Sequence, residues 1–120
     1  MSKHILIAED ETVIANMMGQ VLRNDNVRVT ITRNGQETLE VMKKDVPDLL
    51  LLDLLLPKLD GYGVMKAMKE KKLDCPVIVV TNVSDKSTRD ACKEFDVKGF
   101  FVKSDMDDNA LWDMLEKYLR

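Results

Sequence analysis

The sequence predicts an α/β fold in which a parallel five-stranded sheet carries helices on both faces. Five short runs of β-branched and aliphatic residues alternate along the chain with stretches that have one apolar stripe at helical spacing. Several of the runs are apolar at successive positions, which is typical of strands buried on both faces of a parallel sheet. Strict alternation of strand and helix, with right-handed crossovers, then gives a three-layer sandwich.

The expected strands are bounded by polar or turn-forming residues. In chain order they are Ile5 to Ala8, Val27 to Ile31, Leu49 to Leu52, Val77 to Val80 and Gly99 to Val102. Pro47 and Pro76 come just ahead of the third and fourth strands, where a residue without a backbone N–H is tolerated.

Helices are indicated between the strands by apolar residues that recur at helical spacing. The stripes are Ile14, Met17, Met18 and Val21; Leu39 with Met42; Val64 with Met65 and Met68; and Leu111 with Met114, Leu115 and Tyr118. Asn34-Gly35 and Asp60-Gly61 mark turns that precede helices, and Ser104 or Asp105 is expected to cap the last helix.

Length and composition indicate one cytoplasmic domain covering residues 1–120. A chain of 120 residues, 45% apolar and 32% charged, can bury one core but has no room for a second domain of ordinary size. A net charge of −3, with no Lys/Arg run interleaved with aromatics, argues against direct nucleic-acid binding. Neither a signal peptide nor a membrane span is apparent, so we expect Cys75 and Cys92 to stay reduced in the cytoplasm.

Residues with reactive or charged side chains come directly after four of the five expected strands. Glu9 and Asp10 follow the first, Asp53 the third, Thr81 the fourth and Lys103 the fifth. In open α/β sheets, ligands bind beyond the carboxyl ends of the strands. If these four strands are neighbours, their side chains converge on one pocket.

Such a pocket requires a cation. Carboxylates about 4 Å apart repel by roughly 4 kcal/mol per pair at an effective dielectric of 20. Mg²⁺ fits best, because it prefers a few carboxylates, several waters and a phosphate oxygen, and Mn²⁺ could substitute for it. Glu9, Asp10 and Asp53 would bind this metal, and an ionised Asp53 could then attack a phosphoryl group as a nucleophile.

The order of these residues resembles the receiver domain of bacterial response regulators, the phosphoacceptor domain of two-component signalling. The resemblance covers nearly the whole chain, and its motifs are Ile5 to Glu11, Pro47 to Asp53, Pro57, Asp60-Gly61, Thr81 and Phe100 to Lys103. It implies a doubly wound, flavodoxin-like fold with strand order 2-1-3-4-5, an order for which a chemotaxis regulator of this family is the standing example.

The resemblance also implies a role for each site residue. Asp53 would accept the phosphoryl group, and the metal would be held by Glu9, Asp10, Asp53 and the backbone carbonyl of Leu55. Lys103 would contact the phosphoryl group, and Thr81 would move toward it. Phe100 would rotate into the vacated space, which would reshape a surface formed by the last two helices and the strand between them.

Three positions depart from the family pattern. Ser104 stands where a Pro in a cis bond usually follows the Lys, and a cis bond before a non-proline costs roughly 3 kcal/mol, which favours a trans bond. Phe100 lacks the hydroxyl of the more common Tyr, and Asn82 replaces a small residue. Leu55 and Val83 would flank the site without orienting water, which predicts slow self-dephosphorylation.

The expected partners are a histidine kinase or phosphotransfer protein and an output protein, with the chain a monomer or a phosphorylation-dependent homodimer. Two alternatives remain open. A pseudo-receiver would keep the fold without being phosphorylated, although no acid or Lys is missing here. A haloacid-dehalogenase-like phosphatase normally has a second Asp two residues after the nucleophile, where this chain has Leu55.

Overall fold

The computed structural model describes residues 3–24, 26–82, 85–105 and 107–119. Five parallel strands form one sheet in the order β2-β1-β3-β4-β5, which confirms the predicted fold. The strands are β1 (Lys3–Ala8), β2 (Val27–Thr32), β3 (Leu49–Leu52), β4 (Val77–Thr81) and β5 (Val97–Val102). The helices are α1 (Thr12–Leu22), α2 (Gly35–Lys44), α3 (Gly61–Lys71), α4 (Lys86–Cys92) and α5 (Asp108–Leu119), with a 3₁₀ turn, η1 (Lys103–Asp105), before the last of them.

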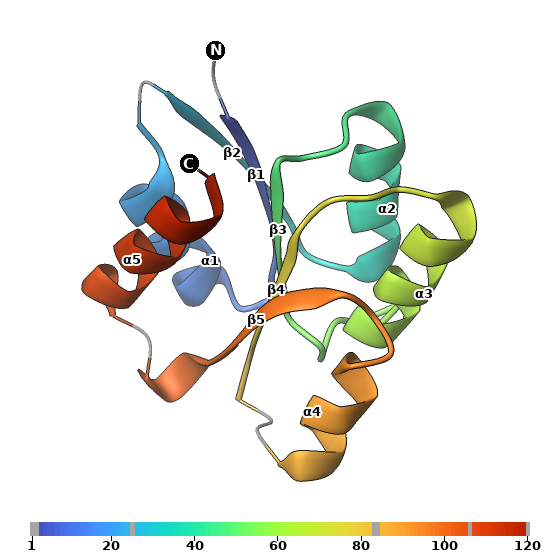
Figure 1. Cartoon of the computed structure of the whole chain (residues 1–120). Helices are drawn as coiled ribbons and strands as arrows, with labels where there is room; N and C mark the ends of the chain where they lie inside the picture. The colour runs from blue at the N-terminus through green and yellow to red at the C-terminus, as the bar shows by residue number, and fades with distance from the viewer. Residues whose placement is uncertain (1–2, 25, 83–84, 106, 120) are drawn as a thin grey trace.

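The sheet separates two layers of helices, as Figure 1 shows. Helices α1 and α5 lie on one side of it, and α2, α3 and α4 lie on the other. None of the described helices combines the length and the apolar character that a membrane span requires.

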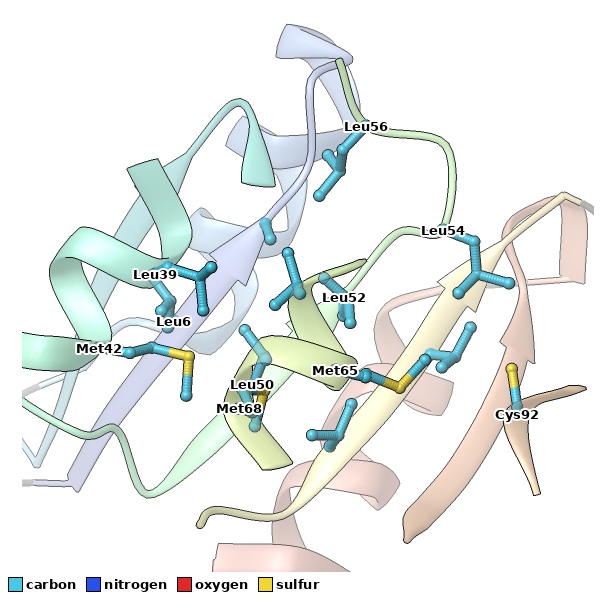
Figure 2. Close-up of a cluster of buried hydrophobic side chains, with 14 residues drawn as sticks. Leu6, Leu39, Met42, Leu50, Leu52, Leu54, Leu56, Met65, Met68 and Cys92 are labelled. Carbon is cyan, nitrogen blue, oxygen red and sulfur yellow. The ribbon is translucent and has the colours of Figure 1, made fainter. Parts of the chain in front are cut away.

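Each face of the sheet has its own apolar core, because successive strand residues point to opposite faces. Leu6, Leu50 and Leu52 pack with α2 and α3 residues such as Met42 and Met65 (Figure 2). On the other face, the alternate strand residues pack with residues of α1 and α5; they include Ile5, Ile7, Leu49, Leu51, Ile78 and Val80. All four residues of β3 are buried, as a central strand covered on both sides requires.

Strand β5 lies at the edge of the sheet and contributes one aromatic ring to each core. Phe100 packs against the core on the α2 and α3 side, and Phe101 packs against the core on the α1 and α5 side. The pairing with β4 is irregular between Val77 and Ile78, where the register shifts by one residue. Since that shift accommodates Lys98, the strand begins two residues earlier than Gly99, where the sequence predicted its start.

Helices α2, α3 and α5 start at acidic or amide caps. Asn34 accepts a hydrogen bond from the backbone N–H of Glu37, and Asp60 accepts one from that of Gly63, both at 2.8 Å, as the turn signals predicted. The expectation that Ser104 or Asp105 caps the last helix is wrong. Those residues form the 3₁₀ turn, and the carboxylate of Asp107 accepts the N–H of Ala110 at 2.8 Å instead.

Candidate functional site

The candidate site lies at the carboxyl ends of β1, β3 and β5, where backbone hydrogen bonds carry the sheet one residue further. The N–H of Asp53 donates to the carbonyl of Ala8 at 3.0 Å, and the N–H of Glu9 donates to that of Thr32 at 3.0 Å. These bonds fix the backbone from which both carboxylates project. Glu9 and Asp53 are therefore held side by side at the rim of the sheet.

Lys103 brings these carboxylates together. Its Nζ lies 2.6 Å from Oε1 of Glu9 and 2.8 Å from Oδ2 of Asp53. The side chains of all three residues are 5% exposed or less, so the ion pairs are screened from water. The Nζ atom also lies 3.4 Å from Oε1 of Glu11, which is more than half exposed.

Glu9, Asp10 and Asp53 form a cluster suited to a divalent cation. Each offers a carboxylate oxygen, and these oxygens lie within 4.8 Å of one another. Glu9 and Asp53 are buried, whereas Asp10 is exposed, so the cluster opens to solvent on one side. When all three carboxylates are ionised, they and the one ammonium leave two negative charges, which a divalent cation balances.

Burial and close charges shift the protonation equilibria in the site. Burial raises the pKa of Glu9 to about 7, the ion pair with Lys103 opposes this rise, and the nearby Asp53 carboxylate adds to it. Burial acts to lower the pKa of Lys103, but the bonds to Asp53 and Glu9 outweigh it and raise that pKa above its ordinary value. The ammonium therefore stays charged, and Glu9 is the member of the pair that resists ionisation.

The loop after β3 is fitted closely to Asp53. Oδ1 of Asp53 accepts a hydrogen bond from the backbone N–H of Leu55 at 3.2 Å. Gly61, the first residue of α3, packs against the same backbone, since a Cβ there would lie 2.6 Å from the carbonyl oxygen of Asp53. The side chain of Leu55 is 63% exposed at the mouth of the site. A larger residue than Gly at position 61 would push on the loop that carries Asp53.

The two residues expected to act as the switch lie on neighbouring strands. Thr81 is the last residue of β4, fully buried, and its register partner is Val102, the residue before Lys103. Phe100 is half-buried in β5, and the guanidinium carbon of Arg89 lies 4.5 Å from the centre of its ring. The peptide bond between Lys103 and Ser104 is trans, as expected for a bond that precedes a residue other than proline.

The structure thus brings together Glu9, Asp10, Asp53 and Lys103, and it places Thr81 at the end of β4, one strand away. Sequence reasoning assigned no role to Glu11 or Arg89. Glu11 could have been noticed as the third acid in an acidic triplet, whereas nothing in the sequence pairs Arg89 with Phe100. Val83, expected to flank the site, lies outside the described residues.

Comparison with known proteins identifies a family. The model for the response regulator receiver domain matches residues 5–116. The chain is 36% identical over 99 residues to ycf27 of Porphyridium aerugineum, a probable transcriptional regulator, and 35% identical over 78 residues to the response regulator SaeR of Staphylococcus aureus. These matches cover 82% and 65% of this chain but only 41% and 34% of the relatives, which are therefore much longer proteins.

Solved structures agree with the fold. The phosphorylated cyanobacterial phytochrome response regulator RcpA superposes with a TM-score of 0.89 at 25% identity, over 99% of this chain and 95% of that one. The receiver domain of a sensor histidine kinase from Pseudomonas aeruginosa superposes with a TM-score of 0.85 at 24% identity, over 99% and 98% of the two chains. That second structure has a magnesium ion coordinated in its active-site cleft.

Proposed function

Because this chain belongs to the response regulator receiver domain family of two-component signalling, we propose that it is a switch driven by phosphorylation of Asp53. Receiver domains act as regulators, and under this proposal residues 1–120 form one such domain. The observation that carries the proposal is the meeting of Lys103 with Glu9 and Asp53 at 2.6 and 2.8 Å, beside a third carboxylate from Asp10.

A divalent cation fits the residues that surround Asp53. The carboxylates of Glu9, Asp10 and Asp53 are hard oxygen ligands, and the backbone carbonyl of Leu55 is the fourth ligand that we propose. The exposed side of the cluster leaves room for waters and for a phosphate oxygen. Mg²⁺, or Mn²⁺ in its place, would neutralise negative charge on the transferred phosphoryl group.

The residues of the chain do the rest of the proposed chemistry. One carboxylate oxygen of Asp53 forms a bond to phosphorus as the bond from phosphorus to the donor breaks, and the donor imidazole leaves with that electron pair. Lys103 stays next to the phosphoryl oxygens because its ammonium already contacts Asp53. Phosphoryl transfer needs little more than such positioning and charge neutralisation.

The signal would then pass to the face formed by α4, β5 and α5. In this proposal the hydroxyl of Thr81 moves toward the phosphoryl group, and Phe100 rotates inward. Thr81 ends β4, the strand next to β3, and Phe100 lies in β5 on the far side of β4, so the path crosses a single strand. An output protein would distinguish the two positions of Phe100, which amounts to a population shift between two packings.

The donor in this proposal is a histidine kinase or a phosphotransfer protein. A small phosphodonor would serve as well in the test tube, because Asp53 is the nucleophile. The chain would be a monomer, or a homodimer when phosphorylated. The exposed Leu55 side chain cannot hold a water in line with the phosphorus, which supports slow self-dephosphorylation.

The test is intact-mass spectrometry of the chain after incubation with acetyl phosphate and Mg²⁺. We expect a gain of one phosphoryl group, which disappears in Asp53→Asn and on chelation of the metal, while Asp48→Asn, a matched change outside the site, retains it. Absence of the gain in the native chain would show a pseudo-receiver. Repeated turnover of a phosphate ester would show a phosphatase.

A further inference from the structure

A cavity of about 650 Å³ lies at the amino-terminal ends of β4 and β5, at the other end of the strands from the candidate site. One wall comes from α3 and residues 73–76, which lead into β4, and the other comes from residues 94–96, which lead into β5 (Figure 1). The volume is typical of pockets that bind small molecules, and apolar residues outnumber charged ones in the lining. The phosphorylation chemistry proposed above uses none of these residues.

The floor of this cavity is apolar and adaptable. It is formed by Met65, Met68, Leu73, Val77, Phe95 and Val97. Leu73, Phe95 and Val97 are only half-buried, so they retain apolar surface that a ligand could cover. Met65 and Met68 project from α3 (Figure 2), and the flexible thioether of a methionine packs against many shapes. An occupant would therefore need an apolar body.

The irregular pairing of β4 with β5 lies in the wall of the cavity. Val77 of β4 pairs with Val97 of β5, but the next pair skips Lys98, which also lines the cavity. Such bulges are enriched beside functional sites, because the extra residue redirects side chains and interrupts the pairing. The cavity therefore opens where the edge of the sheet departs from its regular ladder.

The rim of the cavity carries an excess of negative charge. Its acids are Asp74, Glu94 and Asp96, and its lysines are Lys69 and Lys98. Lys98 and Asp96 form an ion pair with each other at 2.9 Å. Within the described part of the chain, no ion pair involves Asp74 or Glu94, and both carboxylates are exposed. These two acids face a single remaining cation, Lys69, so the rim favours a positively charged ligand.

Cys75 gives a second indication of the sign of that charge. Burial raises the pKa of its thiol to about 12, and the carboxylates of Asp74 and Asp48 add to the rise. The thiol therefore stays protonated at neutral pH and contributes no charge of its own to the cavity. The same carboxylates that disfavour a thiolate at this position would stabilise an ammonium.

We propose that this cavity binds a small amphipathic amine, whose aromatic or aliphatic body lies on the apolar floor and whose ammonium pairs with Asp74 and Glu94. Charge complementarity favours this class of ligand over carboxylates and phosphates, which the acidic rim would repel. An ammonium that contacted both acids would link the segment before β4 to the segment before β5. The ligand would thereby stabilise the turn that joins α4 to β5.

The test titrates 4-phenylbutylamine into the ¹⁵N-labelled full chain, in a buffer with Mg²⁺, and maps binding by amide ¹H–¹⁵N shifts. Two matched probes are 4-phenylbutyrate, which carries a carboxylate in place of the ammonium, and butylamine, which lacks the ring. The protein variants are D74N/E94Q and, as a charge-matched control on exposed acids outside the cavity, E40Q/D113N. All four positions are exposed, so the substitutions should not disturb the fold, and the amide spectrum of each variant checks this.

We expect shifts within residues 73–77 and 94–98 and a Kd on the order of 1 mM, as for other ligands of this size. Binding should be about fivefold weaker to D74N/E94Q, unchanged in E40Q/D113N, and weaker for both altered probes. Equal binding of 4-phenylbutyrate, equal binding by D74N/E94Q, or no binding at all would overturn the inference. If D74N/E94Q does not fold, the three probes compared on the native chain still test it.

Two other outcomes would also overturn the inference. Shifts confined to the surroundings of Asp10 and Asp53 would show that the amine binds the acidic site as a simple cation. A dimer whose formation shifts residues 94–98 without any probe would show that a second copy of the chain covers the cavity. Neither result bears on phosphorylation, because amine binding is measured without a phosphodonor and the mass gain at Asp53 is measured without an amine.

Discussion

The Nζ atom of Lys103 lies 2.8 Å from Oδ2 of Asp53, although the two residues are 50 positions apart in the chain. Neither side chain is more than 5% exposed, and Glu9 occupies a second position beside the same ammonium. Breaking a buried ion pair by removing one partner leaves the other charge without compensation. These ion pairs therefore contribute to the stability of the fold.

Lys103→Met is expected to lower the free energy of unfolding by about 3 kcal/mol in the presence of a chelator, because Glu9 and Asp53 lose their buried counter-charge. Urea denaturation at neutral pH measures this. Lys98→Met removes an exposed ion pair with Asp96 and should cost less than about 1 kcal/mol. Equal losses in the two variants would mean that the Lys103 contacts do not stabilise the fold.

Mg²⁺ is expected to stabilise the native chain by about 2.7 kcal/mol when its concentration is about a hundred times its Kd, because the metal binds the folded cluster and not the unfolded chain. Asp10→Asn removes one of the three carboxylates and should abolish most of this gain. Glu40→Gln, on the exposed face of α2, should leave it intact. Thermal unfolding at a series of Mg²⁺ concentrations measures the stabilisation of each variant. If Asp10→Asn is stabilised as much as the native chain, Asp10 is not a metal ligand.

Gly61→Ala should destabilise the fold by about 1–3 kcal/mol, since its Cβ would lie 2.6 Å from the Asp53 carbonyl oxygen and 2.7 Å from the Leu54 Cα. Gly19→Ala is the matched control. The atoms nearest to its Cβ would be the ends of side chains, with Ile31 the closest at 3.3 Å, and alanine favours a helix by up to about 1 kcal/mol over glycine. The midpoints of urea denaturation measure both effects. An unchanged midpoint for Gly61→Ala would show that the loop after β3 can move to accommodate the added Cβ.

His4 is expected to make stability fall as the pH drops from about 7 to about 5. Burial lowers its pKa in the folded chain, and Arg28 adds to this effect, so below about 6.5 the unfolded state takes up the proton more readily. The part of the unfolding free energy that depends on the neutral imidazole ring is present in full above that pH and is lost below it. His4→Gln should therefore give a flatter curve of unfolding free energy against pH, because other groups contribute alike to both proteins. Parallel curves would contradict the assignment.

Leu55→Asn should shorten the lifetime of the phosphorylated chain severalfold, because an amide beside Asp53 can orient the attacking water and an aliphatic chain cannot. The position is 63% exposed, so the change should not disturb the fold. Loss of the phosphoryl mass over time, after the phosphodonor is removed, measures the rate. Leu55→Met should behave like the native chain, and loss within seconds from the native chain itself would disprove slow self-dephosphorylation.

The fold could be predicted because the signals that specify it are local. The apolar run from Leu49 to Leu52 is bounded by Asp48 and Asp53, and the structure places β3 on those four residues. The start of β5 was harder, because Asp96 and Lys98 interrupt its pattern. An edge strand tolerates such charges, and the register shift beside them depends on pairing with β4.

The site was only partly predictable for a related reason. The positions of Glu9, Asp53 and Lys103 follow from where strands end, and those residues do meet. The distances between them depend on how three strands align, and the sequence contains no direct measure of that alignment. The contact of Arg89 with Phe100 was missed because it depends on how the short helix α4 is placed over β5.

Phe100 and Phe101 are adjacent in the chain, yet their rings belong to the two separate cores. Sliding β5 along its neighbour would disturb the packing of both layers at once, whereas turning one ring about its Cα–Cβ bond affects a single layer. Motion on the α4 side can therefore be decoupled from α1 and α5. The sheet therefore separates two layers: the layer that contains α4 can rearrange while the packing of α1 and α5 on the opposite face stays unchanged.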